Sequence, residues 1–279
     1  MLGKAGSIDV GEVVLDLEDA VVPGRKSQAL AAAVEALGDQ RFRSPSLAVR
    51  VNAPGSRWAH EELIALAAAA PALRSVVVPK VESAGDLAFV DRLLTGAELA
   101  AGRERPLKVQ ALIETARAMS DLPAITAASE RLEAIILGYV DLAASLGRSP
   151  VGANDLDLWL PAQDAFLTAA RAAGVRAIDG AFAAIDDLDG LGAWARRAAA
   201  LGFDAKWAIH PSQLEVIASA FSPSEEEVEW AQSVLDALAA AAERGNGAVM
   251  FEGEMLDEPV RLAAVRTLAR AGRAPGVQP

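Results

Sequence analysis

The chain has 279 residues, of which 52% are hydrophobic and 23% charged, so it can bury a large core and has a length typical of one α/β barrel. Its 38 Asp and Glu against 26 Lys and Arg give a formal net charge of −12, which disfavours nucleic acid and anionic lipid as partners. The absence of Cys excludes disulfides, thiolate metal sites and Cys nucleophiles, and two His are too few for a multi-histidine metal site. No uncharged apolar stretch is long enough to span a membrane, and the first residues lack the hydrophobic core of a signal peptide, so we expect a cytoplasmic protein.

Apolar, β-branched segments alternate with Ala- and Leu-rich segments along most of the chain. The Ala- and Leu-rich segments repeat apolar residues at spacings of three and four, as around Leu63, Leu87 and Leu191, which predicts helices. Strands that are apolar throughout and are joined by helices predict a parallel sheet covered on both faces. The predicted strands are, in chain order, residues 12–16, 46–52, 75–81, 108–114, 133–139, 175–179 and 205–210.

These elements predict an α/β fold, a TIM-type (β/α)8 barrel that lacks its first strand. Seven predicted strands are one fewer than such a barrel needs, and residues 1–9 resemble the end of a helix that should follow a preceding strand. Three explanations remain open: the barrel closes with seven strands, the gene product begins upstream, or the sequence is truncated.

Beyond residue 221 the pattern changes. Ser224 and Glu227 form a capping box, which predicts a helix to about Glu243. Residues 248–256 predict a short hairpin that turns at Glu252 and Gly253, and a last helix is expected to start near Pro259. We therefore expect a barrel over residues 1–221 and a C-terminal arm or lid over residues 222–279 that contacts a neighbouring subunit.

Acidic residues follow two neighbouring predicted strands, Glu114 after the fourth and Asp141 after the fifth. The carboxyl ends of barrel strands meet at one edge, where active sites are built. Two carboxylates there suit Mg²⁺, with water and substrate as its remaining ligands. The pair therefore predicts a magnesium site. An ion pair with Arg50 or a cap on the following helix are the alternatives.

The other predicted strand ends carry mostly acidic groups, with Arg50 and Lys80 as the cations. An acid-lined pocket that holds a cation suits metal-assisted enolate chemistry, in which a fixed guanidinium stabilises the developing negative oxygen. For Arg50 the alternative is a structural salt bridge. For Asp257, near the start of the last predicted helix, the alternative to a functional role is an N-cap.

Six short motifs, in this order and spacing, resemble the citrate lyase β-chain-like branch of the HpcH/HpaI aldolase family, which includes malyl-CoA and citramalyl-CoA lyases. The resemblance extends from about Val10 to Arg270. The motifs are Leu15-Asp-Leu-Glu-Asp-Ala-Val21, Val49-Arg-Val-Asn-Ala-Pro-Gly55, Val78-Pro-Lys-Val-Glu-Ser83, Leu112-Ile-Glu-Thr-Ala-Arg117, Ala177-Ile-Asp-Gly180 and Lys206-Trp-Ala-Ile-His-Pro-Ser-Gln213.

The resemblance implies a modified TIM barrel that holds Mg²⁺ on Glu114 and Asp141, with Arg50 contacting the thioester or enolate oxygen. It also implies that Asp257 reaches a neighbouring subunit's active site as an acid/base, so that a homo-trimer or hexamer is part of catalysis. Relatives usually begin with a strand that bears Leu-Phe-Val-Pro, often preceded by an arginine, and this strand is not present in the sequence.

The resemblance implies a Mg²⁺-dependent lyase that cleaves or forms a β-hydroxyacyl-CoA thioester such as malyl-CoA or citramalyl-CoA, with an α-keto acid and an acyl-CoA as the other partners. Three alternatives stay open. The first is a malate synthase-like condensation followed by thioester hydrolysis. The second is a citrate lyase β subunit that acts on a thioester of an acyl carrier protein. The third is a non-catalytic barrel.

Overall fold

The computed structural model describes residues 6, 8, 10–38, 42–149 and 156–273. Packing divides the chain into two compact units, one formed by Met1–Ile185 and Arg197–Pro211, and the other by Asp186–Arg196 and Ser212–Pro279. None of the described helices is long and apolar enough to cross a membrane.

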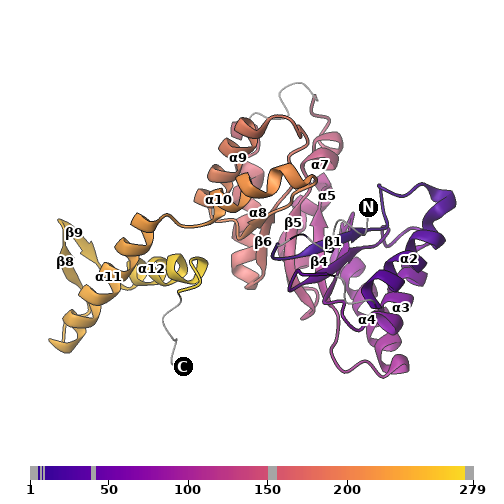
Figure 1. Cartoon of the computed structure of the whole chain (residues 1–279), viewed down its shortest axis with the longest axis horizontal. Coiled ribbons are helices and arrows are strands. Elements are labelled where there is room, and N and C mark those ends of the chain that lie inside the picture. Colours follow the sequence, from indigo (N-terminus) through magenta and orange to yellow (C-terminus); the bar gives the residue numbers. More distant parts are fainter. Residues whose placement is uncertain (1–5, 7, 9, 39–41, 150–155, 274–279) are drawn as a thin grey trace. The chain divides into compact units, whose positions relative to one another are not determined.

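The first unit is built on a curled, parallel sheet (Figure 1). Its strands lie side by side in chain order: β1 Val13–Asp16, β2 Leu47–Arg50, β3 Ser75–Val78, β4 Lys108–Ile113, β5 Leu132–Leu137, β6 Arg176–Asp179 and β7 Ala205–Lys206. Each overlaps a strand predicted from the sequence. Within the described residues β1 pairs only with β2 and β7 only with β6, so the sheet forms seven strands of a TIM-like barrel.

Helices connect successive strands, as a parallel sheet requires. They are η1 Pro23–Arg25, α2 Lys26–Gly38, α3 Ala59–Ala69, α4 Ala84–Ala101, α5 Ala116–Ser120, α6 Leu122–Thr126, α7 Tyr139–Ser145, η2 Leu156–Leu158, α8 Leu160–Ala173 and α9 Leu188–Leu201. Ser83 and Asp86 form a capping box at the start of α4, and Gly102 ends this helix in the left-handed conformation. Local sequence therefore fixes both ends of the longest helix of this unit.

The concave face of the sheet carries side chains in layers, because every second residue of a strand points to the same face. The middle layer is apolar and includes Val14, Ala48, Val77, Leu112 and Ile136. Two residues before the first four of these positions the side chains are polar, namely Glu12, Ser46, Ser75 and Gln110. Two residues after Val14, Ala48 and Leu112 they are charged, namely Asp16, Arg50 and Glu114, and these three side chains lie at the carboxyl edge of the sheet.

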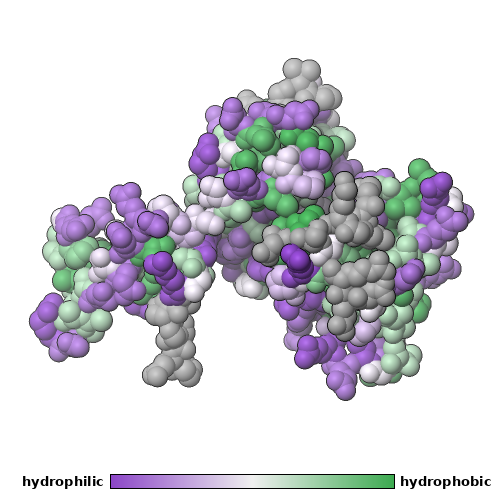
Figure 2. All heavy atoms as spheres, in the orientation of Figure 1, coloured by the Kyte–Doolittle hydropathy of each residue, from purple (hydrophilic) through white to green (hydrophobic). Residues whose placement is uncertain are grey.

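The second unit takes in most of α9 and is otherwise formed by the segment after Pro211. That segment contains the rest of η3 Pro211–Gln213, α10 Leu214–Phe221, α11 Glu225–Glu243, the hairpin β8 Val249–Phe251 and β9 Glu254–Leu256, and α12 Glu258–Arg270. The predicted capping box at Ser224 is present, and the hairpin turns through Glu252 and Gly253, both with positive φ. A small core joins α11, the hairpin and α12 around Val234, Leu256 and Leu268. Figure 2 shows mostly hydrophilic side chains on the visible surface of this unit.

Candidate active site

Arg50 lies at the carboxyl end of β2, next to the end of β1, where it is the register partner of Asp16. Its Nε and Nη2 donate to the two carboxylate oxygens of Asp16 at 2.8 and 2.7 Å. Its Nη1 lies 3.0 Å from a carboxylate oxygen of Glu18, and its guanidinium lies 5.9 Å from the centre of the Trp207 ring. The predicted structural salt bridge therefore exists, with Asp16 and Glu18 as its acids, and it holds the guanidinium in one orientation.

The pKa values of the two carboxylates beside Arg50 shift in opposite directions. Burial favours the neutral form of Asp16, but the hydrogen bonds and charge of Arg50 outweigh it and lower the pKa of Asp16. Burial raises the pKa of Glu18, even though Lys80 and Arg50 both act to lower it. Lys80 Nζ donates to Glu18 Oε1 at 2.8 Å. Arg50, Lys80, Asp16 and Glu18 therefore form one cluster of charges at the carboxyl ends of β1 to β3.

Lys80 adopts an unusual backbone conformation, with a φ of 52°. A residue other than glycine seldom adopts this left-handed conformation, which costs energy and occurs preferentially at functional sites. Here the conformation accompanies a hydrogen bond from the Lys80 backbone N–H to Glu114 Oε1 at 2.8 Å. The loop after β3 thus fixes the carboxylate that follows β4.

Glu114 is buried, with 3% of its surface exposed, and follows Leu112 by two residues on the inner face of the sheet. Gly138 packs directly against it, because a Cβ at position 138 would lie 2.7 Å from Glu114 Cβ and 2.8 Å from Glu114 Oε2. Burial raises the pKa of Glu114 to about 8; the hydrogen bond from Lys80 opposes this rise, and the charges of Asp141 and Glu18 add to it.

Asp141 is half-buried in the first turn of α7, which begins directly after β5. Within the part of the chain that the structure describes, its carboxylate makes no hydrogen bond or ion pair, and α7 has no side-chain cap, so the two structural alternatives find no support there. The negative charge of Asp141 contributes to the raised pKa of Glu114.

The Glu114–Asp141 pair fits a divalent cation. The two acids follow neighbouring strands, the charge of Asp141 raises the pKa of Glu114, and hard oxygen ligands are those that Mg²⁺ prefers. No group of three His, Cys, Asp or Glu suited to a metal occurs among the described residues, so water and substrate would have to supply the remaining ligands. Sequence reasoning selected these two residues and Arg50, and the structure brings all three to the same edge of the sheet.

Asp257, the fourth predicted site residue, lies in the second unit at the N-cap position of α12. Its side chain makes no capping hydrogen bond, so the capping role expected by default is not present. The position is half-buried, directly after β9.

Sequence reasoning missed the groups that hold the strand-end loops. Lys26 is buried and donates through Nζ to the carbonyl oxygens of Leu17 and Glu18 at 2.8 and 2.7 Å. Glu62 is buried and accepts from the backbone and side-chain nitrogens of Asn52 at 2.7 and 2.6 Å. Lys26 lies between Arg25 and Ser27 at the start of α2, and Glu62 follows Glu61 in α3, so the neighbouring residues gave no signal of burial.

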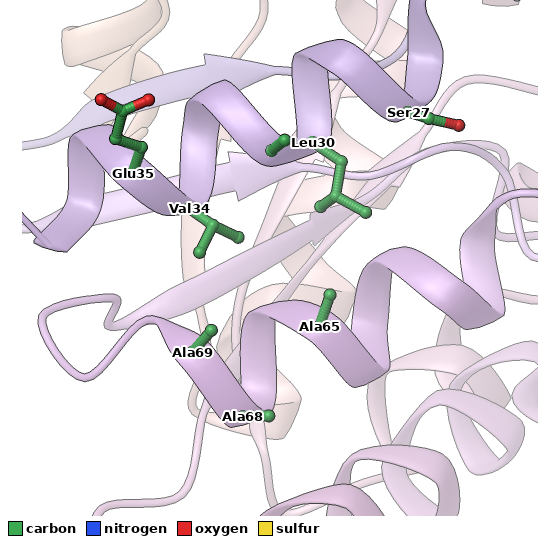
Figure 3. A pocket seen from close by; sticks show the side chains of 8 residues that line it. Ser27, Leu30, Val34, Glu35, Ala65, Ala68 and Ala69 are labelled. Carbon is green, nitrogen blue, oxygen red and sulfur yellow. The ribbon is translucent and has the colours of Figure 1, made fainter.

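A groove on the outside of the sheet lies between α2 and α3, and its lining includes none of Arg50, Glu114 and Asp141 (Figure 3). It is lined mainly by aliphatic side chains, among them Leu30, Val34 and Ala65, with Glu35 as its one charged residue. An apolar groove with an acid does not suit an anionic substrate.

Residues 1–211 match the HpcH/HpaI aldolase/citrate lyase family. The chain is 37% identical over 269 residues to the L-malyl-CoA/β-methylmalyl-CoA lyase of Cereibacter sphaeroides, covering 91% of this chain and 84% of that protein. It is 32% identical over 280 residues to the mitochondrial citramalyl-CoA lyase of Homo sapiens, covering 96% of this chain and 81% of that protein.

Among solved structures, the CitE protein of Mycobacterium tuberculosis in complex with magnesium, acetoacetate and coenzyme A is similar to this chain. The TM-score is 0.74 and the sequence identity 36%, over 93% of this chain and 89% of that one. The names of these relatives agree with the predicted lyase class, and the magnesium in the solved relative agrees with the predicted cofactor. The resemblance drawn from the six motifs is thus confirmed, and the chain belongs to the HpcH/HpaI aldolase/citrate lyase family.

Proposed function

We propose that the protein is a Mg²⁺-dependent carbon–carbon lyase that cleaves, or in reverse forms, a β-hydroxyacyl-CoA thioester such as malyl-CoA or citramalyl-CoA. The observation that carries this proposal is the pair of acids, Glu114 and Asp141, at the same strand edge as a guanidinium held in a fixed orientation. The names of the relatives support the substrate class.

Glu114 and Asp141 are the residues that would hold the cation, which when bound polarises the oxygens of the substrate's hydroxyacid end. Glu114 must give up its proton to do so, because its pKa in the metal-free protein is about 8. The backbone N–H of Lys80 then keeps the ionised carboxylate oriented.

Cleavage begins when a base removes the proton of the β-hydroxyl group. The electron pair of that O–H bond forms the carbonyl of the α-keto acid, and the pair of the broken C–C bond passes to the acyl-CoA as an enolate. The enolate carbon then takes up a proton from the protonated base or from water, which gives the acyl-CoA product. Arg50, already oriented by Asp16, stabilises the negative thioester oxygen. Because this charge grows in the transition state, the interaction lowers the barrier rather than only tightening binding.

Asp257 is the proposed acid/base, acting in the active site of a neighbouring subunit of a homo-trimer or hexamer. Its carboxylate makes no capping bond in its own subunit, which suits a role elsewhere. An Asp257→Asn protein and a Glu114→Gln protein, each inactive alone, should recover activity when they are mixed and allowed to exchange subunits. No recovery despite demonstrated exchange would contradict catalysis across the subunit interface.

The direct test is to incubate the protein and Mg²⁺ with a panel of malyl-, citramalyl- and methylmalyl-CoA, and to follow keto acid and free CoA separately. EDTA-sensitive release of keto acid without free CoA is the expected result. Free CoA in proportion to turnover would instead show hydrolysis. Turnover only with an acyl-carrier thioester would make the protein a citrate lyase β subunit, and Mg²⁺ binding absent from a folded protein would make it a non-catalytic barrel.

A further inference from the structure

Four buried side chains near the start of α7 are linked in one series of hydrogen bonds. Gln163 Nε2 donates to the hydroxyl of Tyr139 at 2.8 Å, and this hydroxyl donates to Asp179 Oδ1. Lys206 Nζ donates to Asp179 Oδ2 and to the carbonyl oxygen of Gly180, both at 2.6 Å. The side chains of Asp179 and Lys206 are fully buried, so the charge of Lys206 balances that of Asp179 inside the protein.

This network lies on the other side of the strands from the predicted substrate site. Ile178 and Trp207 belong to the cluster on the concave face, and Asp179 and Lys206 are their immediate neighbours in β6 and β7. Adjacent strand residues point to opposite faces, so the Asp179–Lys206 pair faces the helices. Gln163, on α8, comes from that helical layer.

Tyr139 links the network to Asp141, because both residues belong to the first turn of α7. This helix has only seven residues, too few to be stable without tertiary contacts. The ring of Tyr139 packs edge-on against Trp159 at 5.0 Å between centroids. Gly180 also approaches so closely that a Cβ there would lie 2.9 Å from Tyr139 Cδ2 and 2.0 Å from the Leu137 carbonyl oxygen. The start of α7 therefore has little room to shift.

The two proposed metal ligands are held in different ways. The Glu114 carboxylate is fixed directly, by the Lys80 backbone N–H and by contact with Gly138. Among the residues the structure describes, the Asp141 carboxylate has no hydrogen bond or ion pair of its own, so the backbone of α7 determines where it lies. Any group that anchors the first turn of α7 therefore controls the separation of the two carboxylates.

We propose that the buried network Gln163–Tyr139–Asp179–Lys206 positions Asp141 for Mg²⁺, with Tyr139 as the residue that transmits the constraint. The inference rests on the proposed function, since it takes Glu114 and Asp141 as the ligands. Groups that orient metal ligands without touching the metal typically change metal affinity by about 10- to 100-fold.

The test is Tyr139→Phe, which keeps the ring and its contact with Trp159 and removes only the hydroxyl. Titration of the metal-free protein with Mn²⁺, followed by electron paramagnetic resonance, and with Mg²⁺, followed by calorimetry, measures affinity without relying on turnover. We expect the dissociation constant to rise about tenfold, the low end of the usual range. The loss of turnover should be larger at limiting Mg²⁺ than at saturating Mg²⁺.

A matched control is Thr126→Val, which removes a buried hydroxyl that donates to the Leu122 carbonyl oxygen within α6. It should lower the melting temperature without changing metal affinity. Gln163 is one hydrogen bond further from Asp141 than Tyr139 is, so Gln163→Met should weaken metal binding less than Tyr139→Phe. It serves as a second variant if Tyr139→Phe does not fold. An unchanged Mn²⁺ affinity in a folded Tyr139→Phe or Gln163→Met protein would overturn the proposal.

Asp141→Asn separates this inference from the assignment of the ligands. If Asp141→Asn abolishes Mn²⁺ binding and Tyr139→Phe does not weaken it, the ligand assignment stands and the positioning role fails. If Asp141→Asn binds Mn²⁺ like the unchanged protein, the ligand assignment itself fails, and with it the positioning role.

Discussion

The two polar layers inside the curled sheet come from the same strands and differ in chemistry. Near the amino ends, Gln110 Nε2 donates to Glu12 and to Ser75 at 2.7 and 2.9 Å, and Ser46 donates to Glu12 at 2.7 Å. Near the carboxyl ends, Asp16, Arg50 and Glu114 occupy the inner positions. The amino layer contains one acid and neutral partners, whereas the carboxyl layer concentrates charges of both signs.

The comparison separates stability from function within one interior. The residues of the amino layer hydrogen-bond with one another, although the buried Gln110 Oε1 finds no partner in the described part of the chain, and none of them has the positive φ found at Lys80. The carboxyl layer keeps a buried carboxyl with a pKa of about 8, a strained loop and an acid without a hydrogen bond among the described residues. In barrels the carboxyl edge holds the active site and the amino edge contributes to stability, and both layers fit that division.

The largest expected effect comes from removing one carboxylate of the carboxyl layer. Glu114→Gln or Asp141→Asn should lower kcat/KM by on the order of 10² or more, by analogy with the loss of one group that stabilises the transition state. Glu133→Gln is the matched control, because Glu133 lies near the amino end of β5 and pairs with Arg74 and Arg176. Steady-state kinetics at several Mg²⁺ concentrations measure the effect. If Asp141→Asn turned over substrate as fast as the unmutated protein at limiting Mg²⁺, Asp141 would not be a metal ligand.

A pH titration tests the same layer in the unmutated protein. The pKa of Glu114 is raised from 4.5 to about 8, so the metal-free folded state holds a proton that the unfolded state releases. The stability of the metal-free protein should therefore fall as the pH rises from about 4.5 to about 8. Mg²⁺ needs the ionised carboxylate, so its affinity should fall by up to about tenfold for each unit of pH below 8. Calorimetry in buffers of different ionisation enthalpy should show proton release on binding near pH 7.

In Glu114→Gln the fall of metal-free stability between pH 4.5 and 8 should be reduced, since the group that binds the proton is gone. A Mg²⁺ affinity of the unchanged protein that is constant between pH 6 and 8 would contradict the raised pKa.

A smaller effect is expected from Arg50→Lys, which keeps the charge and removes the two-point contact with Asp16. A lysine cannot reproduce this fork, so its ammonium is not held in one orientation. We expect kcat to fall on the order of tenfold, less than the loss expected when a donor is removed entirely. Mg²⁺ affinity should change little, since Arg50 is not a proposed ligand. A variant with unchanged kcat would show that Asp16 holds Arg50 for stability alone.

Gly138→Ala tests the packing that fixes Glu114. The added Cβ would meet Glu114 Cβ at 2.7 Å, so Glu114 or the start of α7 must move. Overpacking of this kind costs about 1–3 kcal/mol and should also weaken Mg²⁺ binding. Gly55→Ala is the control, because a Cβ there meets no atom within 4 Å. Equal melting temperatures for the two variants would show that the site tolerates the shift.

The strands, and the positions of Arg50, Glu114 and Asp141 at their carboxyl ends, could be predicted because each signal is local in the sequence. A β-branched run followed by Glu114 or Arg50 identifies both a strand and its carboxyl end. The conformation of Lys80 and the network from Gln163 to Lys206 could not be predicted in this way. Each depends on residues far apart in sequence that meet only in the folded sheet, as Lys80 meets Glu114. Gly138 shows the same limit. A residue without a Cβ is required there because Glu114, which follows the neighbouring strand, lies too close.

The smallest expected effect lies in the amino layer. Ser75 is fully buried, and Ser75→Ala removes one of the two acceptors of Gln110 Nε2 while leaving the bond to Glu12. Loss of one such hydrogen bond should lower the free energy of unfolding by about 1 kcal/mol, measured by urea denaturation. Because the apolar layer of Val77 and Leu112 separates this position from Glu114, kcat/KM and Mg²⁺ affinity should stay unchanged. A tenfold loss of activity without a loss of stability would show that the two layers are coupled through the apolar one.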